Sequence, residues 1–266
     1  MLYHSTIGNP NGALVAVLHG ILGSGLNWTG FIKHLLSLRP DLQFVLIDLR
    51  NHGRSPHYSD ENTLLQTAME VLELQQELGS FEAIIGHSFG GKVALQIANI
   101  PFFNEIEQYW ILDSSPGIVD IDPRDPLEVS QVLNVLRSIE LPVERRIMVK
   151  EQLMQKGLSL MLAQWMTTNL KKEKDGYRWK FNLQGVQEMI QDYFEQDLWT
   201  ILEDPSLDFD VHFVRATQSD RWDQKSIERL DQTPERSTIH HLDAGHWVHV
   251  DNPEGLSQIL SQNLLS

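Results

Sequence analysis

Short apolar runs alternate along the chain with longer stretches in which apolar residues recur at helical spacing. The runs lack a clean alternation of apolar and polar residues, as expected of strands that are buried on both faces of a parallel sheet. They cover residues 13–18, 44–48, 81–85, 109–113, 211–216 and 238–242. A helical pattern over residues 64–78 ends at Gly79, and a last helix is predicted over residues 253–264 with Asn252 as its N-cap. This alternation predicts an α/β fold with a mostly parallel central sheet flanked by helices.

The stretch from residue 117 to residue 205 interrupts that alternation. It contains helical patterns at 129–139, 143–156, 158–170 and 183–194, a charged run at 171–176 that we interpret as a solvated turn, and no clear buried strand. We therefore predict a core formed by residues 1–116 and 206–266, with residues 117–205 inserted as a helical cap before the penultimate strand. Six large side chains of this segment either line an apolar binding space or pack the cap onto the core: Met161, Trp165, Met166, Trp179, Phe181 and Trp199.

The overall charge of the chain bears on which classes of binding partner are expected. The 266 residues include 36 acidic side chains against 21 Lys and Arg, which gives a net charge of −15. Such a field repels phosphate backbones and anionic lipid surfaces, so neither nucleic acid nor a membrane is an expected partner. The absence of cysteine excludes a thiol nucleophile. The first twelve residues lack the basic and apolar segments of a signal peptide, so a cytoplasmic location is expected. The oligomeric state stays open.

One short motif carries the main chemical signal. Residues 86–90, Gly-His-Ser-Phe-Gly, have the form G-x-S-x-G. A predicted strand leads directly into them, and a good helical sequence, residues 92–98, follows. A sharp strand–turn–helix of this kind projects the serine oxygen from the carboxyl edge of the sheet, where open α/β sheets bind ligands. We predict that Ser88 is a nucleophile.

A glycine-rich loop after the first predicted strand supplies the second signal. Residues 19–25 read His-Gly-Ile-Leu-Gly-Ser-Gly. Acyl transfer builds negative charge on the former carbonyl oxygen, which two preorganised backbone amides can stabilise. We expect these oxyanion-hole amides to be those of Ile21 and of Phe89, the residue after the nucleophile. His19 is interpreted as a structural residue that bonds nearby backbone.

A serine hydroxyl needs a base, and in this chain order the base comes last. His246 lies after the last predicted strand and before the last helix, so we predict that it is the base. The neighbouring histidines do not have metal-ligand spacing, and His240 and His241 point to opposite faces of a predicted strand. No metal is expected, and His249 is interpreted as a packing residue.

Two aspartates compete to orient the base. Asp113 ends the predicted strand before the cap, and Asp220 follows the strand after it. Both preserve the order Ser, acid, His, and both lie at carboxyl ends of strands. Position alone slightly favours Asp220, because the acid of this fold more often follows the later strand.

Three segments resemble a known family. Residues 48–57, Asp-Leu-Arg-Asn-His-Gly-Arg-Ser-Pro-His, resemble the corresponding segment of YbfF-type bacterial carboxylesterases and their mitochondrial relatives. Residues 86–94 and 244–249 are similar to the nucleophile turn and the histidine loop of the same family. The resemblance implies an α/β-hydrolase fold and hydrolysis of carboxylic esters, with short to medium acyl chains, through an acyl-enzyme and without a cofactor.

Residue by residue, the resemblance implies that Ser88 is the nucleophile and His246 the base. The family's acid precedes the cap in a D-x-x-P setting, which corresponds to Asp113. This sequence departs from those relatives by having Asp220 as well. We therefore favour Asp113 as the acid, with Asp220 as the alternative. Four polar residues of the 48–57 segment are interpreted first as loop-fixing: Arg50, Asn51, His52 and Arg54.

Other functions fit the same motifs. Thioester hydrolysis, C–C bond hydrolysis and a lyase of the menaquinone-pathway type use related sites on the same fold, and a non-catalytic ligand-binding protein could also be built on it. We predict ester hydrolysis and keep these reactions and the binding role as alternatives.

Overall fold

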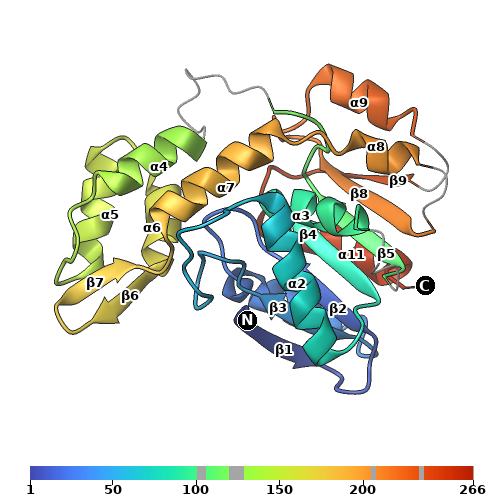
Figure 1. Ribbon diagram of the computed structural model, residues 1–266, viewed down its shortest axis with the longest axis horizontal. Helices are drawn as coiled ribbons and strands as arrows, with labels where there is room; N and C mark the ends of the chain where they lie inside the picture. The colour runs from blue at the N-terminus through green and yellow to red at the C-terminus, as the bar shows by residue number, and fades with distance from the viewer. Residues whose placement is uncertain (101–105, 120–128, 205–207, 234–236, 266) are drawn as a thin grey trace.

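The structure is a computed structural model that describes residues 1–100, 106–119, 129–204, 208–233 and 237–265 (Figure 1). Its centre is a seven-stranded sheet of order β1-β3-β2-β4-β5-β8-β9. The strands are β1 (His4–Gly8), β2 (Leu14–Leu18), β3 (Gln43–Ile47), β4 (Ala83–His87), β5 (Gln108–Leu112), β8 (Asp210–Ala216) and β9 (Ser237–Leu242). β1 pairs antiparallel with β3, and every other pairing in this sheet is parallel. The predicted α/β-hydrolase fold is confirmed.

Helices cover both faces of the sheet because successive strand residues point to opposite sides. In β2, Ala16 and Leu18 belong to one apolar cluster and Val15 and Val17 to the other. α2 (Leu64–Leu78) and α3 (Phe89–Ala98) pack on the first side, whereas α1 (Thr29–Leu36) and α11 (Pro253–Asn263) pack on the second. As predicted, the Asn252 side chain caps α11 by accepting a hydrogen bond from the Gly255 amide. Three short helices complete the core: η1 (Gly25–Trp28), α9 (Gln224–Leu230) and α10 (Val248–Asp251).

An insertion, defined here as the segment from α4 to α8, separates β5 from β8. Its elements are α4 (Val129–Arg137), α5 (Arg146–Gln155), α6 (Leu160–Thr168), β6 (Leu170–Glu173), β7 (Gly176–Trp179), α7 (Leu183–Glu195) and α8 (Trp199–Glu203). Figure 1 shows α4, α5, α6 and the two strands gathered beyond one end of the sheet, with α7 leading back toward it. The predicted boundary at residue 205 lies outside the described residues.

The insertion is mostly helical, but it also contains two strands that we did not predict, because β6 and β7 form an antiparallel hairpin. Most residues of the charged run that we interpreted as a solvated turn belong to this hairpin, and the turn itself is limited to Lys174 and Asp175. The hairpin was missed because the side chains of residues 171–173 are exposed, so the strand has no apolar alternation. The hairpin is held by backbone hydrogen bonds between β6 and β7 and not by burial of the β6 side chains.

Four of the six large side chains singled out in the insertion are buried. Met166, Trp179, Phe181 and Trp199 are buried, whereas Met161 is 60% exposed. Trp165 is half-buried and contacts Trp247, a core residue beside His246, with 5.7 Å between ring centroids. Trp165 is therefore the member of this set that faces the predicted site.

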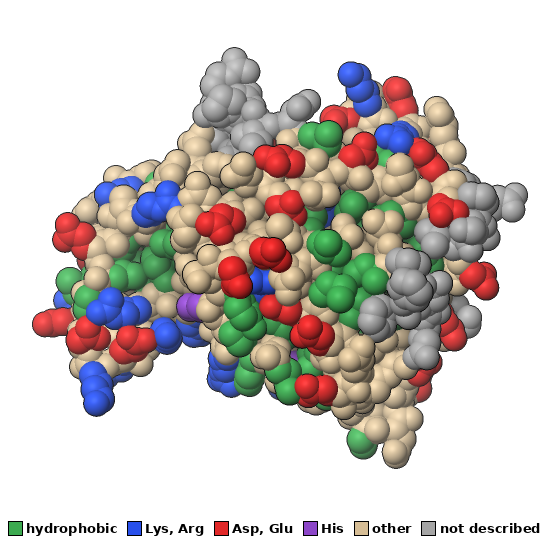
Figure 2. Space-filling view, in the orientation of Figure 1, with side chains coloured by type: hydrophobic (Ala, Val, Ile, Leu, Met, Phe, Trp, Pro, Cys, Tyr) green, Lys and Arg blue, Asp and Glu red, His purple; other side chains and the backbone are tan. Residues whose placement is uncertain are grey.

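The surface view of Figure 2 shows acidic side chains spread over one face of the molecule, in keeping with the net charge of −15. Within the described ranges, no helix combines the length and the apolar character that crossing a bilayer requires.

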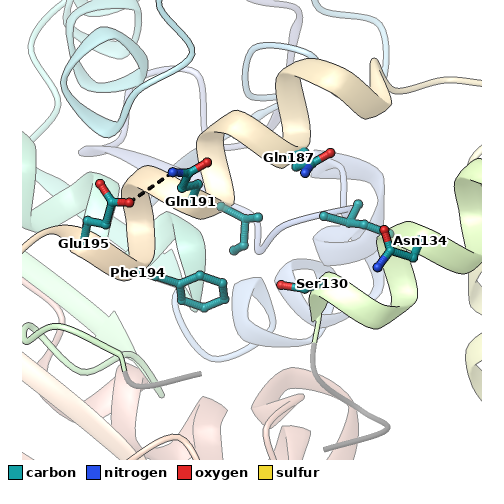
Figure 3. A pocket seen from close by; sticks show the side chains of 8 residues that line it. Ser130, Asn134, Gln187, Gln191, Phe194 and Glu195 are labelled. Carbon is teal, nitrogen blue, oxygen red and sulfur yellow. Dashed lines mark hydrogen bonds between the residues drawn. The ribbon is translucent and has the colours of Figure 1, made fainter. Parts of the chain in front are cut away.

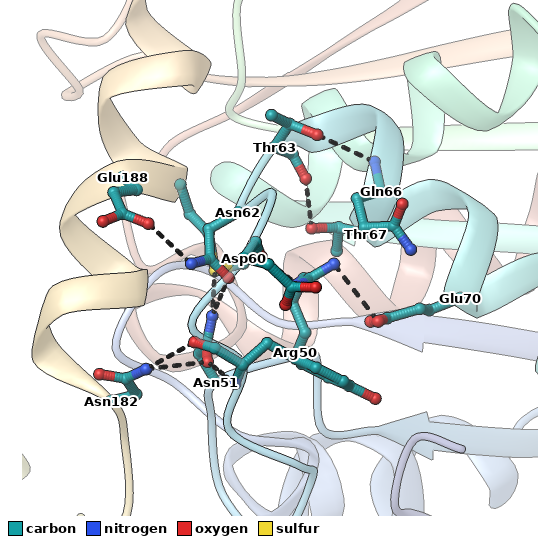
Figure 4. Close-up of polar contacts among 12 residues, drawn as sticks. Arg50, Asn51, Asp60, Asn62, Thr63, Gln66, Thr67, Glu70, Asn182 and Glu188 are labelled. Atoms are coloured by element: carbon teal, nitrogen blue, oxygen red, sulfur yellow. Dashed lines mark hydrogen bonds and ion pairs between the residues drawn. The ribbon is translucent and has the colours of Figure 1, made fainter.

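A polar network joins the core to α7 (Figure 4). Arg50 forms a buried ion pair with Glu70 at 3.3 Å. The Asn51 side chain donates to Asn62 at 2.6 Å, and the Asn62 amide donates in turn to Glu188 of α7 at 2.7 Å. The loop-fixing interpretation of Arg50 and Asn51 agrees with these contacts, which tie the 48–62 segment to both α2 and the insertion.

Candidate active site

Ser88 occupies the sharp turn between β4 and α3. Its φ of 52° and ψ of −117° lie outside the favoured regions for an L-residue, a strain typical of functional turns. Close approach of the backbone explains the flanking glycines. A Cβ on Gly86 would lie 2.1 Å from the Gly90 carbonyl oxygen, and one on Gly90 would lie 2.4 Å from that of Leu18. The turn leaves Ser88 partly exposed at the carboxyl edge of the sheet.

Strand register places Asp113 near Ser88. His87 of β4 pairs with Leu112 of β5, so Ser88 and Asp113 each follow the end of a paired strand. Asp113 is fully buried with a φ of 47°, and its Oδ1 accepts a hydrogen bond from the Ala216 amide at 3.2 Å. The carboxylate is thus fixed by the neighbouring strand, with Oδ2 left for another donor.

That donor is His246. Its Nδ1–H donates to Asp113 Oδ2 at 2.7 Å, and its Nε2 lies 3.0 Å from Ser88 Oγ, in position to accept the hydroxyl proton. The structure therefore connects three of the predicted site residues in one hydrogen-bonded chain. This geometry matches the requirements of a nucleophile, a base and an orienting acid.

Asp220 lies elsewhere. Its side chain is 71% exposed, and its Oδ1 lies 3.3 Å from Arg221 Nε. β8 ends at Ala216, whose amide contacts Asp113, and the chain beyond it carries Asp220 into solvent. The geometry thus brings Asp113, and not Asp220, to His246.

The predicted oxyanion loop lies against the nucleophile. A Cβ on Gly20 would lie 3.3 Å from Ser88 Cβ. The Gly20 carbonyl accepts hydrogen bonds from the Gly23 amide at 3.0 Å and from His19 Nδ1 at 2.7 Å. Because a trans peptide points its N–H opposite to its C=O, the Ile21 amide is directed away from these donors. The Phe89 amide begins α3 and has no acceptor within the helix.

Two buried histidines form hydrogen bonds that hold this loop and the neighbouring backbone in place. His19 Nε2 accepts from the Leu49 amide and His52 Nε2 from the Leu22 amide, each at 3.0 Å. Burial lowers the pKa of His19 to about 4, and burial together with the neighbouring His19 lowers the pKa of His52 to about 3. Both rings are therefore neutral at pH 7, and each can accept from the backbone. The structural interpretation of His19 agrees with this arrangement, and His52 has the same kind of role.

A third neutral histidine contacts His246, the predicted base. Burial is the main reason why the pKa of His87 is well below its usual value. His87 Nε2–H donates to the His246 carbonyl at 2.7 Å. His249 stacks on Trp28 with 4.1 Å between centroids, as expected of a packing residue. The loop that contains His246 is thus fixed by uncharged rings, which do not repel a protonated His246.

Lys92 is a residue whose role the sequence reasoning missed. Its side chain is fully buried, and Nζ donates to the carbonyls of Gly117, Tyr193 and Gln196 at 2.6, 2.7 and 3.0 Å. It therefore ties the nucleophile helix to the segment leaving β5 and to the C-terminal end of α7. The available signal was a single charged residue in the mostly apolar sequence of α3.

A hollow of about 360 Å³ lies within the insertion (Figure 3). It is lined by Leu133 and Asn134 of α4 and by Gln187, Ile190 and Phe194 of α7. None of the three hydrogen-bonded residues at the nucleophile lines it, so this hollow is separate from the predicted site.

Comparisons with known proteins agree with the fold and with the motifs. A family model described as the alpha/beta hydrolase family matches residues 15–259. The sn-1-specific diacylglycerol lipase ABHD11 of Danio rerio is 28% identical over 252 residues, which cover 92% of this chain and 76% of that protein. Esterase YbfF of Escherichia coli strain K12 is 25% identical over 260 residues, covering 96% and 94%. A solved marine microorganism esterase is 27% identical with a TM-score of 0.85, covering 98% of both chains. The resemblance to the YbfF-type esterases is confirmed.

Proposed function

This chain belongs to the alpha/beta hydrolase family, and we propose that it is a serine esterase that cleaves carboxylic esters with Ser88, His246 and Asp113 as its catalytic triad. The observation that carries the proposal is the hydrogen-bonded chain from Ser88 Oγ through His246 to Asp113, at 3.0 and 2.7 Å. Relatives named as esterases and as a diacylglycerol lipase support an ester substrate.

The reaction proceeds in two steps. Ser88 Oγ bonds to the ester carbonyl carbon while His246 Nε2 takes the hydroxyl proton, and the resulting oxyanion is stabilised by the amides of Ile21 and Phe89. Collapse of this intermediate breaks the ester bond, and His246 gives the proton to the leaving alcohol. A water molecule then attacks the acyl-enzyme with His246 again as base, which releases the acid and restores Ser88.

Asp113 acts through His246. Its buried carboxylate accepts from Nδ1, which keeps Nε2 free to accept the serine proton and stabilises the imidazolium that forms. Fixing the carboxylate through the Ala216 amide means that this orientation is present before substrate binds.

The first test is substitution of the nucleophile. Ser88→Ala should abolish hydrolysis of p-nitrophenyl butyrate, because no other hydroxyl is placed on His246 in the described residues, while the circular dichroism spectrum stays unchanged. A fluorophosphonate probe should label the unmodified protein at Ser88 and leave the variant unlabelled. Turnover by Ser88→Ala would refute the proposal, and a folded wild-type protein that resists labelling would favour a non-catalytic ligand-binding role.

The second test assigns the acid. Asp113→Asn removes the acceptor for Nδ1–H and favours the wrong imidazole tautomer, so kcat should fall by about 10³- to 10⁴-fold. Asp220→Asn is the matched control, because the same change is made at a side chain that is 71% exposed, and kcat should change less than about twofold. Equal losses in the two variants, or a larger loss in Asp220→Asn, would contradict the assignment.

The third test defines the substrate. We expect the highest kcat/KM on p-nitrophenyl esters with short to medium acyl chains. A parallel series of acyl thioesters and a C–C hydrolase substrate separates the ester reaction from other reactions of this fold. If kcat/KM is more than tenfold higher for thioesters than for esters, the triad would be retained, but the proposed substrate class would change from esters to thioesters.

A further inference from the structure

We propose that Asn169 of the insertion is a positioning residue for the oxyanion hole. Its side-chain amide Nδ2 donates a hydrogen bond to the Leu22 carbonyl at 2.8 Å, across 147 positions of sequence. This contact joins the C-terminal end of α6 to the loop that contains Ile21. The inference rests on the proposed function, in which the Ile21 amide stabilises the oxyanion.

Two hydrogen bonds connect the Asn169 side chain to the Ile21 amide by way of two peptide units. The Leu22 carbonyl and the Gly23 N–H belong to one peptide unit, and that N–H donates to the Gly20 carbonyl at 3.0 Å. The Gly20 carbonyl and the Ile21 N–H belong to a second peptide unit, which this hydrogen bond connects to the first. A continuous series of hydrogen bonds therefore runs from Asn169 Nδ2 through both peptides to the amide that is directed at the oxyanion.

Such a series has an electrostatic and a geometric effect. Each donor polarises the peptide that accepts from it, so the following N–H becomes a better donor. The loop also has an unfavourable backbone conformation, because Leu22 has a φ of 61°. Hydrogen bonds at both ends of Leu22, from its amide to His52 and from Asn169 to its carbonyl, hold it there.

Asn169 is itself well fixed. It is 3% exposed, its backbone N–H bonds within the last turn of α6, and its carbonyl accepts from the Lys180 amide at 2.7 Å. The side chain thus approaches Leu22 from a rigid position at the junction of α6 and the hairpin. We infer that docking of the insertion on the core sets the geometry of the oxyanion hole.

The test removes the donor without changing the shape of the side chain. Asn169→Asp replaces the amide with a carboxylate that cannot donate to the Leu22 carbonyl. Because the effect is on the transition state, kcat for p-nitrophenyl butyrate should fall by about tenfold or more, with KM changed less than about twofold. The affinity for a trifluoromethyl ketone, which forms an oxyanion with the nucleophile, should fall by a similar factor.

Asn182→Asp is the matched control. Asn182 also donates from the insertion to a core carbonyl, that of Tyr58 at 2.8 Å, but it does not contact the oxyanion loop. This variant loses the same kind of bond and should retain kcat and inhibitor affinity within about twofold. If Asn169→Asp does not fold, Asn169→Ala is measured in the same way.

Unchanged kcat and inhibitor affinity in a folded Asn169 variant would overturn the inference, as would equal losses in Asn169→Asp and Asn182→Asp. These outcomes are distinct from failure of the proposed function, which is measured by the activity of Ser88→Ala in the same assay. Loss of stability alone would lower the melting temperature without the parallel loss in kcat and inhibitor affinity.

Discussion

His52 provides a test of how buried imidazoles support the oxyanion loop. It is fully buried, its Nε2 accepts from the Leu22 amide at 3.0 Å, and its Nδ1–H donates to the Arg50 carbonyl at 2.8 Å. The pKa of His52 falls from 6.5 to about 3, because burial and then the nearby His19 disfavour the charged ring. A protonated ring would also lose its acceptor for Leu22.

The sign of the pH dependence follows from proton binding. Between pH 6.5 and about 3 the unfolded chain carries a proton on His52 that the folded protein does not, so stability is lost as the pH falls. At pH 5 the difference of about 1.5 pH units from the unfolded pKa corresponds to about 2 kcal/mol. That is a substantial fraction of the roughly 5–15 kcal/mol that is typical of folded domains.

To test this pH dependence, His52 is replaced in the variant His52→Gln. The Gln oxygen can accept from the Leu22 amide and does not titrate, whereas the bond to the Arg50 carbonyl is lost. We expect the free energy of unfolding at pH 7.5 to be lower than that of the wild type by about 1 kcal/mol. Between pH 7.5 and pH 5, however, the variant should lose about 2 kcal/mol less than the wild type.

Urea unfolding at pH 7.5, 6 and 5, followed by tryptophan fluorescence, measures both quantities. His34→Gln is the control, because His34 is exposed on α1 and should leave the difference between pH 7.5 and pH 5 unchanged. An identical loss of stability in His52→Gln and in the wild type would refute the reasoning.

Three other substitutions test the packing around the site. Gly86→Ala should lower the melting temperature and remove activity, because the added methyl group would lie 2.1 Å from the Gly90 carbonyl oxygen; a normal melting curve would contradict this. Arg50→Met should destabilise the protein by about 3–5 kcal/mol, since it leaves Glu70 buried without its partner, and the double variant with Glu70→Leu should recover much of that loss in urea unfolding. Lys92→Met should lower the free energy of unfolding by about 3 kcal/mol or more, because three carbonyls lose their donor, and a change below 1 kcal/mol would argue against that role.

The sequence alone determined those features that depend on local pattern. Five of the seven central strands, β2, β3, β4, β5 and β8, were predicted because a strand buried on both faces tends to be an apolar run. The sixth predicted strand, β9, lies at an edge of the sheet, and only its Leu242 is buried. The nucleophile and the base were predicted because a G-x-S-x-G turn requires glycines at fixed positions around Ser88, and because His246 follows the last strand. Strand β1 was missed because its sequence, His-Ser-Thr-Ile-Gly, contains one large apolar side chain and so gives no apolar pattern.

Tertiary structure decided which distant groups meet. Asp113 and Asp220 have equivalent positions in the sequence pattern, and only the pairing of β4, β5 and β8 brings the first carboxylate to His246. The hairpin of the insertion and the contact of Asn169 with Leu22 depend on backbone groups, which every residue carries and no sequence pattern marks. Local periodicity therefore specifies the strands and the residues at their ends, whereas the hydrogen bonds that orient those residues are specified only when the segments pack together.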